Sequence, residues 1–332
     1  MQRAIITGAG GLLGRHLTSH LTQQGWVVTA LVRPGSDPAA LEKLGANLLA
    51  CDLSTDKPPG EAVRAANVVF HAAAAVSDWA PWPYFEANTV RATENICAAA
   101  AEARCPRFVH ISTVGVYGVP PRNGTTAEDS PLRSHGRWDY YRRSKIMAEQ
   151  IVWSFHQNKQ LAATVIRPAM MYGPGDRALL ERILPLLRAG KMVFVGEPTT
   201  CVPLVHVRDV ASAAVLAATN SEASGQAFNV VNPERVTQKE FLNTIASLIG
   251  ATPVSKRVPY RLAYAAGFIS EVVAHLLRAS SAPRLTRYRV MLIGHPRSYS
   301  TDKIRAKLGW RALVNFNDGI REAVQWHLDN GL

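Results

Sequence analysis

The feature that most constrains this chain is a glycine-rich turn within its first fourteen residues. Residues 3–7 form an apolar run too brief for a helix, which predicts a strand. Glycines follow at positions 8, 11 and 14, and a helical pattern covers residues 12–24. This order brings a helix N-terminus up to a pyrophosphate, and glycine lacks the Cβ that would block close approach. The sequence therefore predicts a nucleotide-binding turn.

A regular alternation of strands and helices follows this turn. Patterned stretches predict long helices at 84–104 and 140–157. Apolar runs predict strands at 26–32, 46–51, 68–72, 107–111 and 162–167. Such alternation is typical of a parallel sheet covered by helices on both faces. We therefore expect an α/β fold with a doubly wound parallel sheet over residues 1–167.

The second half of the chain loses this alternation. Prolines punctuate residues 168–203, and Thr237 to Glu240 has the pattern of a capping box that opens a helix to Ile249. We interpret residues 168–203 and 233–332 as a smaller α/β lobe that contributes the substrate pocket. Residues 204–232 are expected to return to the first domain.

Composition indicates a folded chain, with 47% apolar and 19% charged residues among 332. No uncharged apolar run reaches the length of about 18 residues that a membrane span needs. The first strand starts before a secretory leader could fit, so we expect a cytoplasmic protein. The four cysteines show neither disulfide nor zinc spacing, and we expect reduced thiols at Cys51, Cys97, Cys105 and Cys201.

The net charge of +12 is concentrated near the C-terminus. Between Lys256 and Arg311 there are twelve Lys and Arg residues against Glu271 and Asp302, which is a net of +10. A solvated basic face, a phosphate-bearing substrate or contact with an anionic membrane surface would each account for it. We do not expect nucleic-acid binding, because no known binding motif or aromatic-interleaved basic run accompanies the charge.

Ligands of open parallel sheets bind beyond the carboxyl ends of the strands, so the residues there are candidates. Arg33 follows the second strand, where a carboxylate would bind a ribose 2′-hydroxyl and a cation suits a 2′-phosphate. This position favours NADP over NAD. Asp52 follows the third strand, where its carboxylate is either an acceptor for an adenine amino group or an ordinary turn residue.

Tyr141 and Lys145 carry the predicted chemistry. They lie four apart on the predicted helix and therefore share one face. The ammonium would lower the tyrosine pKa from about 10, so that the phenol can exchange a proton with a substrate oxygen while hydride moves to or from nicotinamide. Thr113, just after the strand that ends at Ile111, would hydrogen-bond the same oxygen.

The chain resembles the extended short-chain dehydrogenases/reductases over nearly its whole length. The residues that carry the resemblance are Thr7-Gly8-Ala9-Gly10-Gly11-Leu12-Leu13-Gly14, Asp52-Leu53, His71-Ala72-Ala73-Ala74, Ser112-Thr113 ahead of Val116-Tyr117-Gly118, Tyr141 with Lys145, residues 167–176 and residues 205–211. The resemblance implies a Rossmann fold with NAD(P), Tyr141 as acid/base, Lys145 on the nicotinamide ribose and Thr113 as the catalytic hydroxyl. It also implies a homodimer through the helices at 84–104 and 140–157.

The resemblance and the strand-end positions together assign the cofactor site. Asn88 matches the asparagine that precedes the family's dimer helix. The full set is Thr7, Gly8, Gly11, Leu12, Leu13, Gly14, Arg33, Asp52, Leu53, His71, Ala72, Ala73, Ala74, Asn88, Ser112, Tyr141, Lys145, Arg167, Pro168 and Met170. We expect no metal, because His71, His110 and His206 lie on or beside apolar strands without a second ligand at metal spacing and are interpreted as satisfied core histidines.

Departures from the family pattern indicate which branch of the family the chain resembles. Sugar-nucleotide epimerases and dehydratases usually have Asn where this chain has Met170, and a diphosphate-gripping Arg where it has Val202. Residues 283–288, 298–303 and 308–320 resemble the 3β-hydroxysteroid dehydrogenase branch, to which reductases of long-chain 3-oxo acids also belong. Apolar residues at helical spacing over 261–278 predict either a helix packed on its own lobe or a lid over a lipid-like substrate that rests on a membrane.

We therefore predict an NAD(P)-dependent oxidoreductase that interconverts a secondary alcohol and a ketone. The expected substrate is hydrophobic, either steroid-like or a long-chain 3-oxo or 3-hydroxy acid. One alternative is a sugar-nucleotide epimerase or dehydratase. A second is a sensor that binds dinucleotide without chemistry, which the intact pair of Tyr141 and Lys145 disfavours.

Overall fold

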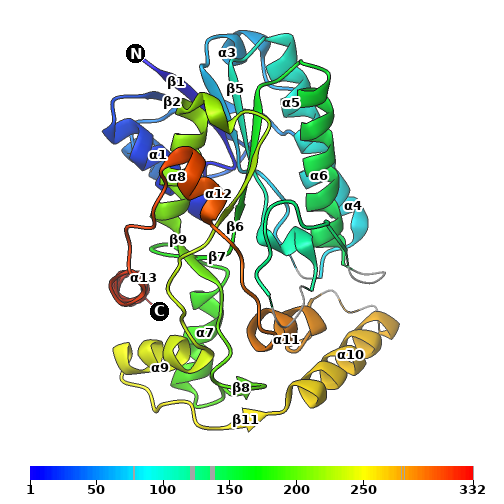
Figure 1. Ribbon diagram of the computed structural model, residues 1–332, viewed down its shortest axis with the longest axis vertical. Coiled ribbons are helices and arrows are strands. Elements are labelled where there is room, and N and C mark those ends of the chain that lie inside the picture. Colours follow the sequence, from blue (N-terminus) through cyan, green and yellow to red (C-terminus); the bar gives the residue numbers. More distant parts are fainter. Residues whose placement is uncertain (78, 120–123, 135–138, 278, 280, 332) are drawn as a thin grey trace.

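The computed structural model describes residues 1–77, 79–119, 124–134, 139–277, 279 and 281–331. Its centre is a seven-stranded sheet in the order β10-β6-β5-β4-β1-β2-β3, in which every pairing is parallel (Figure 1). The strands are β1 (Arg3–Thr7), β2 (Val27–Val32), β3 (Asn47–Ala50), β4 (Val68–His71), β5 (Arg107–Ile111), β6 (Ala163–Pro168) and β10 (Ala227–Val230). The predicted doubly wound α/β fold is confirmed.

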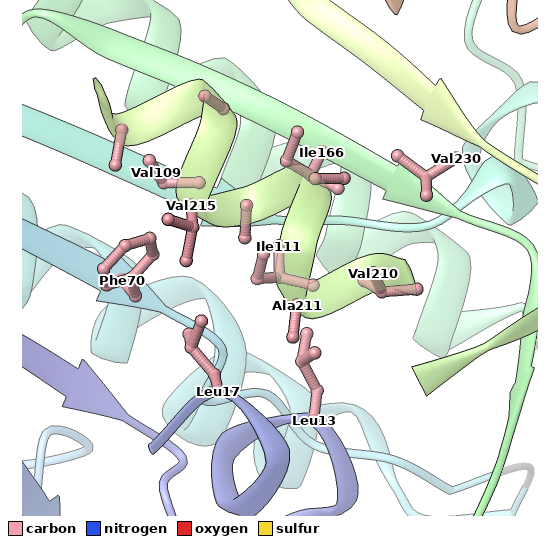
Figure 2. Packing of buried hydrophobic residues seen from close by; sticks show 14 of the residues in the cluster. Leu13, Leu17, Phe70, Val109, Ile111, Ile166, Val210, Ala211, Val215 and Val230 are labelled. Atoms are coloured by element: carbon pink, nitrogen blue, oxygen red, sulfur yellow. The ribbon is translucent and has the colours of Figure 1, made fainter. Parts of the chain in front are cut away.

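Helices cover both faces of this sheet. One face carries α1 (Leu12–Gln23) and α8 (Val207–Thr219), and the other carries α5 (Ala92–Glu102) and α6 (Tyr140–Gln157) (Figure 1). Val215 of α8 and Leu17 of α1 lie over Phe70 of β4 (Figure 2). Because both faces of each central strand are buried, the strands are continuously apolar, which is the pattern that made them predictable.

The strand order reverses between β1 and β4, and this reversal positions the candidate site. β2 and β3 extend the sheet to one side of β1, whereas β4, β5, β6 and β10 extend it to the other. Thr7 is in register with His71, so the glycine turn after β1 lies beside residues 72–74 after β4. A topological switch point of this kind leaves a crevice for ligands beyond the carboxyl ends of the strands.

Most element boundaries agree with the sequence to within one or two residues, and α6 matches its predicted range. The exception is the stretch 84–104, which is not one uniform helix. It consists of α4 (Trp82–Phe85), a π-helical segment (Glu86–Arg91) and α5. The π segment lies where Thr89 Oγ1 accepts a hydrogen bond from Ala75 N at 2.9 Å, so it holds the chain that follows β4. Periodicity of 3.6 could not reveal this local change of winding.

The remaining elements form a second group below the sheet in Figure 1, with its own apolar cluster around Leu184, Phe241 and Ile320. The predicted capping box of Thr237 and Glu240 opens α9. The helices are α7 (Leu180–Arg188), α9 (Gln238–Leu248), α10 (Tyr260–Leu276), α11 (Arg287–Gly294) and α13 (Phe316–Asp329). The two small parallel pairs are β7 (Met170–Tyr172) with β9 (Leu204–His206), and β8 (Phe194–Val195) with β11 (Arg257–Val258).

Three short α-helices and two 3₁₀ turns complete the chain as described. They are α2 (Ala39–Lys43), α3 (Gly60–Arg64), the 3₁₀ turns at Val114–Tyr117 and Ser221–Ala223, and α12 (Asp302–Leu308) near the C-terminus. Among the described residues, no helix has both the length and the apolar character to cross a bilayer. All four cysteines are free thiols.

The glycine turn supplies a matched pair of stability variants. A Cβ on Gly14 would lie 2.2 Å from Gly8 O, whereas one on Gly10 would meet nothing within 4 Å. We expect Gly14→Ala to lower the free energy of unfolding by about 1–3 kcal/mol, because the backbone must move apart. Gly10→Ala should change it by no more than about 0.5 kcal/mol. Chemical denaturation of both variants measures this difference, and equal stabilities would contradict it.

Candidate active site

The turn between β1 and α1 is built by close backbone contacts. Gly8 has φ +66°, and a Cβ on it would lie 2.7 Å from Ala73 N. Gly11 N donates to Gly8 O at 3.0 Å, and Gly11 is the N-cap of α1 without any side-chain cap. The first turn of α1 also contains no acidic residue. Uncapped N–H groups without a nearby carboxylate suit a pyrophosphate, so the turn fits the dinucleotide that the sequence predicts.

A buried hydrogen-bond chain supports this turn. Thr93 Oγ1 donates to Thr89 O at 2.6 Å, so it accepts from His71 Nε2 at 2.9 Å. His71 Nδ1 then accepts from Thr7 Oγ1 at 2.7 Å, and Thr7 in turn accepts from Ala73 N at 3.1 Å. Burial and the Lys145 charge lower the pKa of His71 to about 3, which keeps the imidazole neutral. The side chains of Thr7 and His71 therefore hold the end of β1 against the chain that follows β4.

Arg33 and Asp52 lie together at the carboxyl ends of β2 and β3. Asp52 Oδ1 accepts from Ser54 N at 2.9 Å and from Ser54 Oγ at 2.7 Å. These hydrogen bonds lower the pKa of Asp52, and Arg33 lowers it further. Asp52 thus has the turn role that the sequence left open, while Arg33 is exposed. Leu53 is buried, and its carbonyl accepts from Asn95 Nδ2 at 2.9 Å.

Thr113, Tyr141 and Lys145 meet at the carboxyl end of β5. The Thr113 hydroxyl caps the 3₁₀ turn by accepting from Gly115 N at 3.0 Å, and it also hydrogen-bonds Tyr141. Lys145, one helical turn after Tyr141 on α6, is buried and donates from Nζ to Ile111 O at 2.7 Å. The structure therefore brings the three predicted catalytic residues to one point.

The predicted electrostatics of the pair needs a correction. Burial, and then Tyr288, raise the pKa of Tyr141, and the groups that lower it are Arg142 and Thr113 rather than Lys145. Burial also lowers the pKa of Lys145 to about 8, against the opposing effect of Glu149. The expectation that the lysine makes the phenol acidic is therefore wrong for this arrangement, because burial dominates both groups. Tyr141 is held as a protonated phenol at neutral pH.

Arg167 has a structural task that sequence reasoning missed. Its guanidinium donates to both oxygens of Glu149, at 3.0 and 2.6 Å, and to Tyr117 Oη at 2.8 Å. The pair is almost fully buried and ties β6 to α6. The side chain of Arg167 is thus engaged within the protein, and its expected contact with the cofactor stays a prediction.

The other predicted cofactor residues lie around the same crevice. Ser112 follows β5, and its buried Oγ has no hydrogen-bond partner among the described residues, as expected of a group that meets a ligand. Asn88 is in the π segment and donates to Tyr84 O at 2.9 Å. Met170 is half-buried and begins β7 directly after Pro168 and Ala169.

Two of the three histidines depart from expectation. His71 is fully hydrogen-bonded, whereas His206 accepts from Arg208 N at 3.3 Å through Nδ1 but has no hydrogen-bond partner at its buried Nε2 among the described residues. His110, in contrast, has neither ring nitrogen paired within the described part of the chain, so it is not a satisfied core histidine. Within the same residues there is no group of three side chains able to hold a metal ion.

A pocket of about 880 Å³, including its open mouth, lies between Tyr141 and the C-terminal helices. Tyr288 of α11 stands edge-on to Tyr141, with ring centroids 6.5 Å apart. Sequence reasoning expected the C-terminal lobe to contribute the pocket, but it named none of the α10 and α11 residues that line it, because these helices are more than a hundred residues from Tyr141 along the chain. Six Phe, Tyr and Trp side chains contribute to the lining, and its residues are Ser77, Trp79, Ala80, Phe85, Val119, Asp139, Tyr140, Tyr141, Arg142, Tyr264, Glu271, His275, Arg287, Tyr288 and Met291.

Comparison with known proteins agrees with this geometry. Residues 4–231 match the model of the NAD dependent epimerase/dehydratase family. A 2-alkyl-3-oxoalkanoate reductase of Shewanella oneidensis is 29% identical over 97% of this chain and 85% of its own length. Human short-chain dehydrogenase/reductase family 42E member 1 is 31% identical over 99% of this chain and 88% of its own length.

The fold is also shared by a solved structure. The crystal structure of gox2253 superposes with a TM-score of 0.81 at 26% identity, over 100% of this chain and 99% of that one. The family match spans more than half of the chain and includes the glycine turn, Thr113, Tyr141 and Lys145. The chain belongs to the NAD dependent epimerase/dehydratase family and is an oxidoreductase of the extended short-chain dehydrogenase/reductase type.

Proposed function

We propose that this enzyme reduces a ketone to a secondary alcohol on a hydrophobic substrate, with NADPH as the cofactor. The observation that carries the proposal is the hydrogen-bonded pair of Thr113 and Tyr141 beside a pocket to which six Phe, Tyr and Trp side chains contribute. The Shewanella relative is named for reduction of a 2-alkyl-3-oxoalkanoate, which is a ketone of this chemical class. A steroid-like ketone and a long-chain 3-oxo acid are the substrate classes that we propose.

The cofactor residues follow from the site. The uncapped N-terminus of α1 would hold the pyrophosphate, and exposed Arg33 would pair with a 2′-phosphate, which supports NADP. Ser112 Oγ and Lys145 lie where a nicotinamide ribose would be held. When bound, the nicotinamide supplies the hydride that the protein's own side chains cannot.

Proton transfer is the task of Tyr141. Its raised pKa keeps Oη protonated near pH 7, so it can give a proton to the substrate oxygen as negative charge develops there. Thr113 Oγ1 accepts from Gly115 N, which leaves its hydrogen free to donate to the substrate oxygen, and this bond would orient that oxygen. Lys145, with a pKa of about 8, still carries its charge at neutral pH and would donate hydrogen bonds to the nicotinamide ribose.

The charges of the pocket favour an apolar substrate over a sugar nucleotide. Arg142 is paired with Asp139, and Arg287 Nε donates to Glu271 Oε2 at 2.6 Å. A diphosphate would need cations that are not already neutralised. Val202, at the position of the usual diphosphate-gripping arginine, is 3% exposed and packs in the core of the second cluster. Thermal stabilisation by UDP- or dTDP-sugars would instead favour the epimerase or dehydratase alternative.

We also propose a homodimer through the outer surfaces of α5 and α6. These two helices lie side by side on one face of the sheet (Figure 1). The alternative of a dinucleotide sensor without chemistry is disfavoured by the intact set of Thr113, Tyr141 and Lys145. Consumption of reduced cofactor with any ketone would exclude it.

Removing the Tyr141 hydroxyl tests the proposed chemistry. We expect Tyr141→Phe to lower kcat by about 10²–10⁴-fold, because proton transfer is lost, while NADPH affinity stays nearly unchanged. Tyr140→Phe removes the neighbouring hydroxyl of the same pocket and should keep most activity. Ketone-dependent NADPH oxidation and fluorescence titration of the cofactor provide the measurements. Full activity of Tyr141→Phe would refute the assigned role.

Cofactor choice is tested at Arg33. We expect NADP to bind more tightly than NAD, and Arg33→Ala to weaken NADP binding by about tenfold or more while NAD binding stays unchanged. Lys43→Ala, which removes an exposed cation of α2, serves as the control. Calorimetric titration compares the dissociation constants. If wild-type enzyme binds NAD at least as tightly as NADP, the assignment is wrong.

The lowered pKa of Lys145 predicts the alkaline limb of the pH profile. Below about pH 8 the Lys145 ammonium is charged and would hold the nicotinamide ribose, and above it the charge is lost. We expect kcat for ketone reduction to fall as the pH rises through about 8. Lys145→Met should have low activity and no such limb. A wild-type rate that stays level up to about pH 10, where an ordinary lysine titrates, would contradict this prediction.

A further inference from the structure

Helix α10 presents an unusual apolar surface. Seven of the twelve large apolar side chains that are exposed among the described residues lie between positions 262 and 277. Leu262, Ile269 and Leu276 are 63%, 62% and 77% exposed and recur every seven residues, so they lie on one side of the helix. The other four are Tyr264, Phe268, Val273 and Leu277. Contiguous exposed apolar surface of this kind marks a contact site.

The opposite side of α10 is fully used within the molecule. Ala263, Gly267 and Ala274 are buried, and a Cβ on Gly267 would lie 3.0 Å from Arg287 N, so α11 packs tightly there. Glu271 is buried on this inner side and pairs with Arg287. It is the only acidic residue of α10, so the outer side of the helix carries no negative charge.

Basic residues lie close to α10 along the chain. Lys256 and Arg261 precede or begin α10, and Arg284 precedes α11; all three are exposed. None of the three forms an ion pair with another described residue. They belong to the stretch from Lys256 to Arg311 that carries a net charge of +10. We call the exposed side of α10 with these three residues the basic–apolar face.

We propose that the basic–apolar face docks on the surface of an anionic phospholipid bilayer, with α10 lying in the interfacial plane. An apolar stripe flanked by Lys and Arg binds such surfaces by burying apolar area and by attraction to the lipid headgroups. Figure 1 shows α10 at the outer edge of the molecule, with α11 on its inner side. A second copy of this chain fits less well, because a two-fold contact would place two such basic borders against each other.

The basic–apolar face and the pocket share helix α10, so docking would bring the pocket close to the bilayer. Tyr264 and His275 of α10 line the same pocket as Tyr141. A hydrophobic ketone dissolved in the bilayer would therefore meet the pocket without crossing water, a consequence that rests on the proposed function. Docking itself does not, since vesicle binding is measured without any turnover.

Co-sedimentation with vesicles tests the proposal on the full chain. We expect pelleting with equimolar phosphatidylglycerol and phosphatidylcholine, far less with phosphatidylcholine alone, and weakening by added salt. The triple variant Lys256→Gln, Arg261→Gln and Arg284→Gln should weaken partitioning by at least tenfold, at about fivefold for each charge. The pair Ile269→Gln and Leu276→Gln should also weaken it, because less apolar area enters the headgroup region.

Matched controls distinguish binding through the basic–apolar face from nonspecific binding to vesicles. Lys43→Gln, Arg64→Gln and Lys239→Gln remove the same charge from exposed sites on other helices. Leu313→Gln removes an 83% exposed leucine beside Asp209 of α8. Thermal melts confirm that each variant is folded. Three results would overturn the proposal: no pelleting of wild type with the anionic vesicles, equal pelleting with both compositions, or an equal loss in the control triple.

Discussion

The close approach of backbones at the β1 turn is the constraint on which the rest of the structure depends. Gly8 brings β1 against the chain after β4, and Gly14 brings α1 against Gly8 and Ala9. The hydrogen-bond chain from Thr7 through His71 to Thr93 then ties β1, β4 and α5 together at the point where the strand order reverses. The crevice for the cofactor exists because these contacts hold its two sides at fixed separation.

A buried ion pair between Arg167 and Glu149 positions the helix that carries Tyr141 and Lys145. Glu149 accepts two hydrogen bonds from Arg167 of β6 and lies one helical turn after Lys145 on α6. The same carboxylate therefore anchors α6 to the sheet and opposes the loss of charge on Lys145. Breaking such a pair leaves an uncompensated charge in the interior, so it holds the helix in one register. Tyr141 is carried to the mouth of the pocket by this anchored helix.

The C-terminal segment closes the pocket and is itself fastened to the sheet domain. Asp209 of α8 accepts from Leu313 N at 2.9 Å and from Val314 N at 3.3 Å, and Trp310 Nε1 donates to Asp209 O at 3.1 Å. With residues 310–314 held in this way, the chain before them places Tyr288 against Tyr141 and leaves one side of α10 in solvent. The packing of the C-terminal segment thus forms both one wall of the pocket and the basic–apolar face.

The sequence alone determined the parallel sheet, the nucleotide turn and the grouping of Thr113, Tyr141 and Lys145. These are local or periodic properties: apolar strands, glycines that require close approach, and a spacing of four on a helix. Tertiary structure alone decided what burial does to those groups. It raised the pKa of Tyr141, engaged Arg167 with Glu149, left His110 without a hydrogen-bond partner among the described residues, and decided which α10 and α11 side chains line the pocket. Desolvation and contacts between distant segments depend on the packed chain, and no spacing along the sequence encodes them directly.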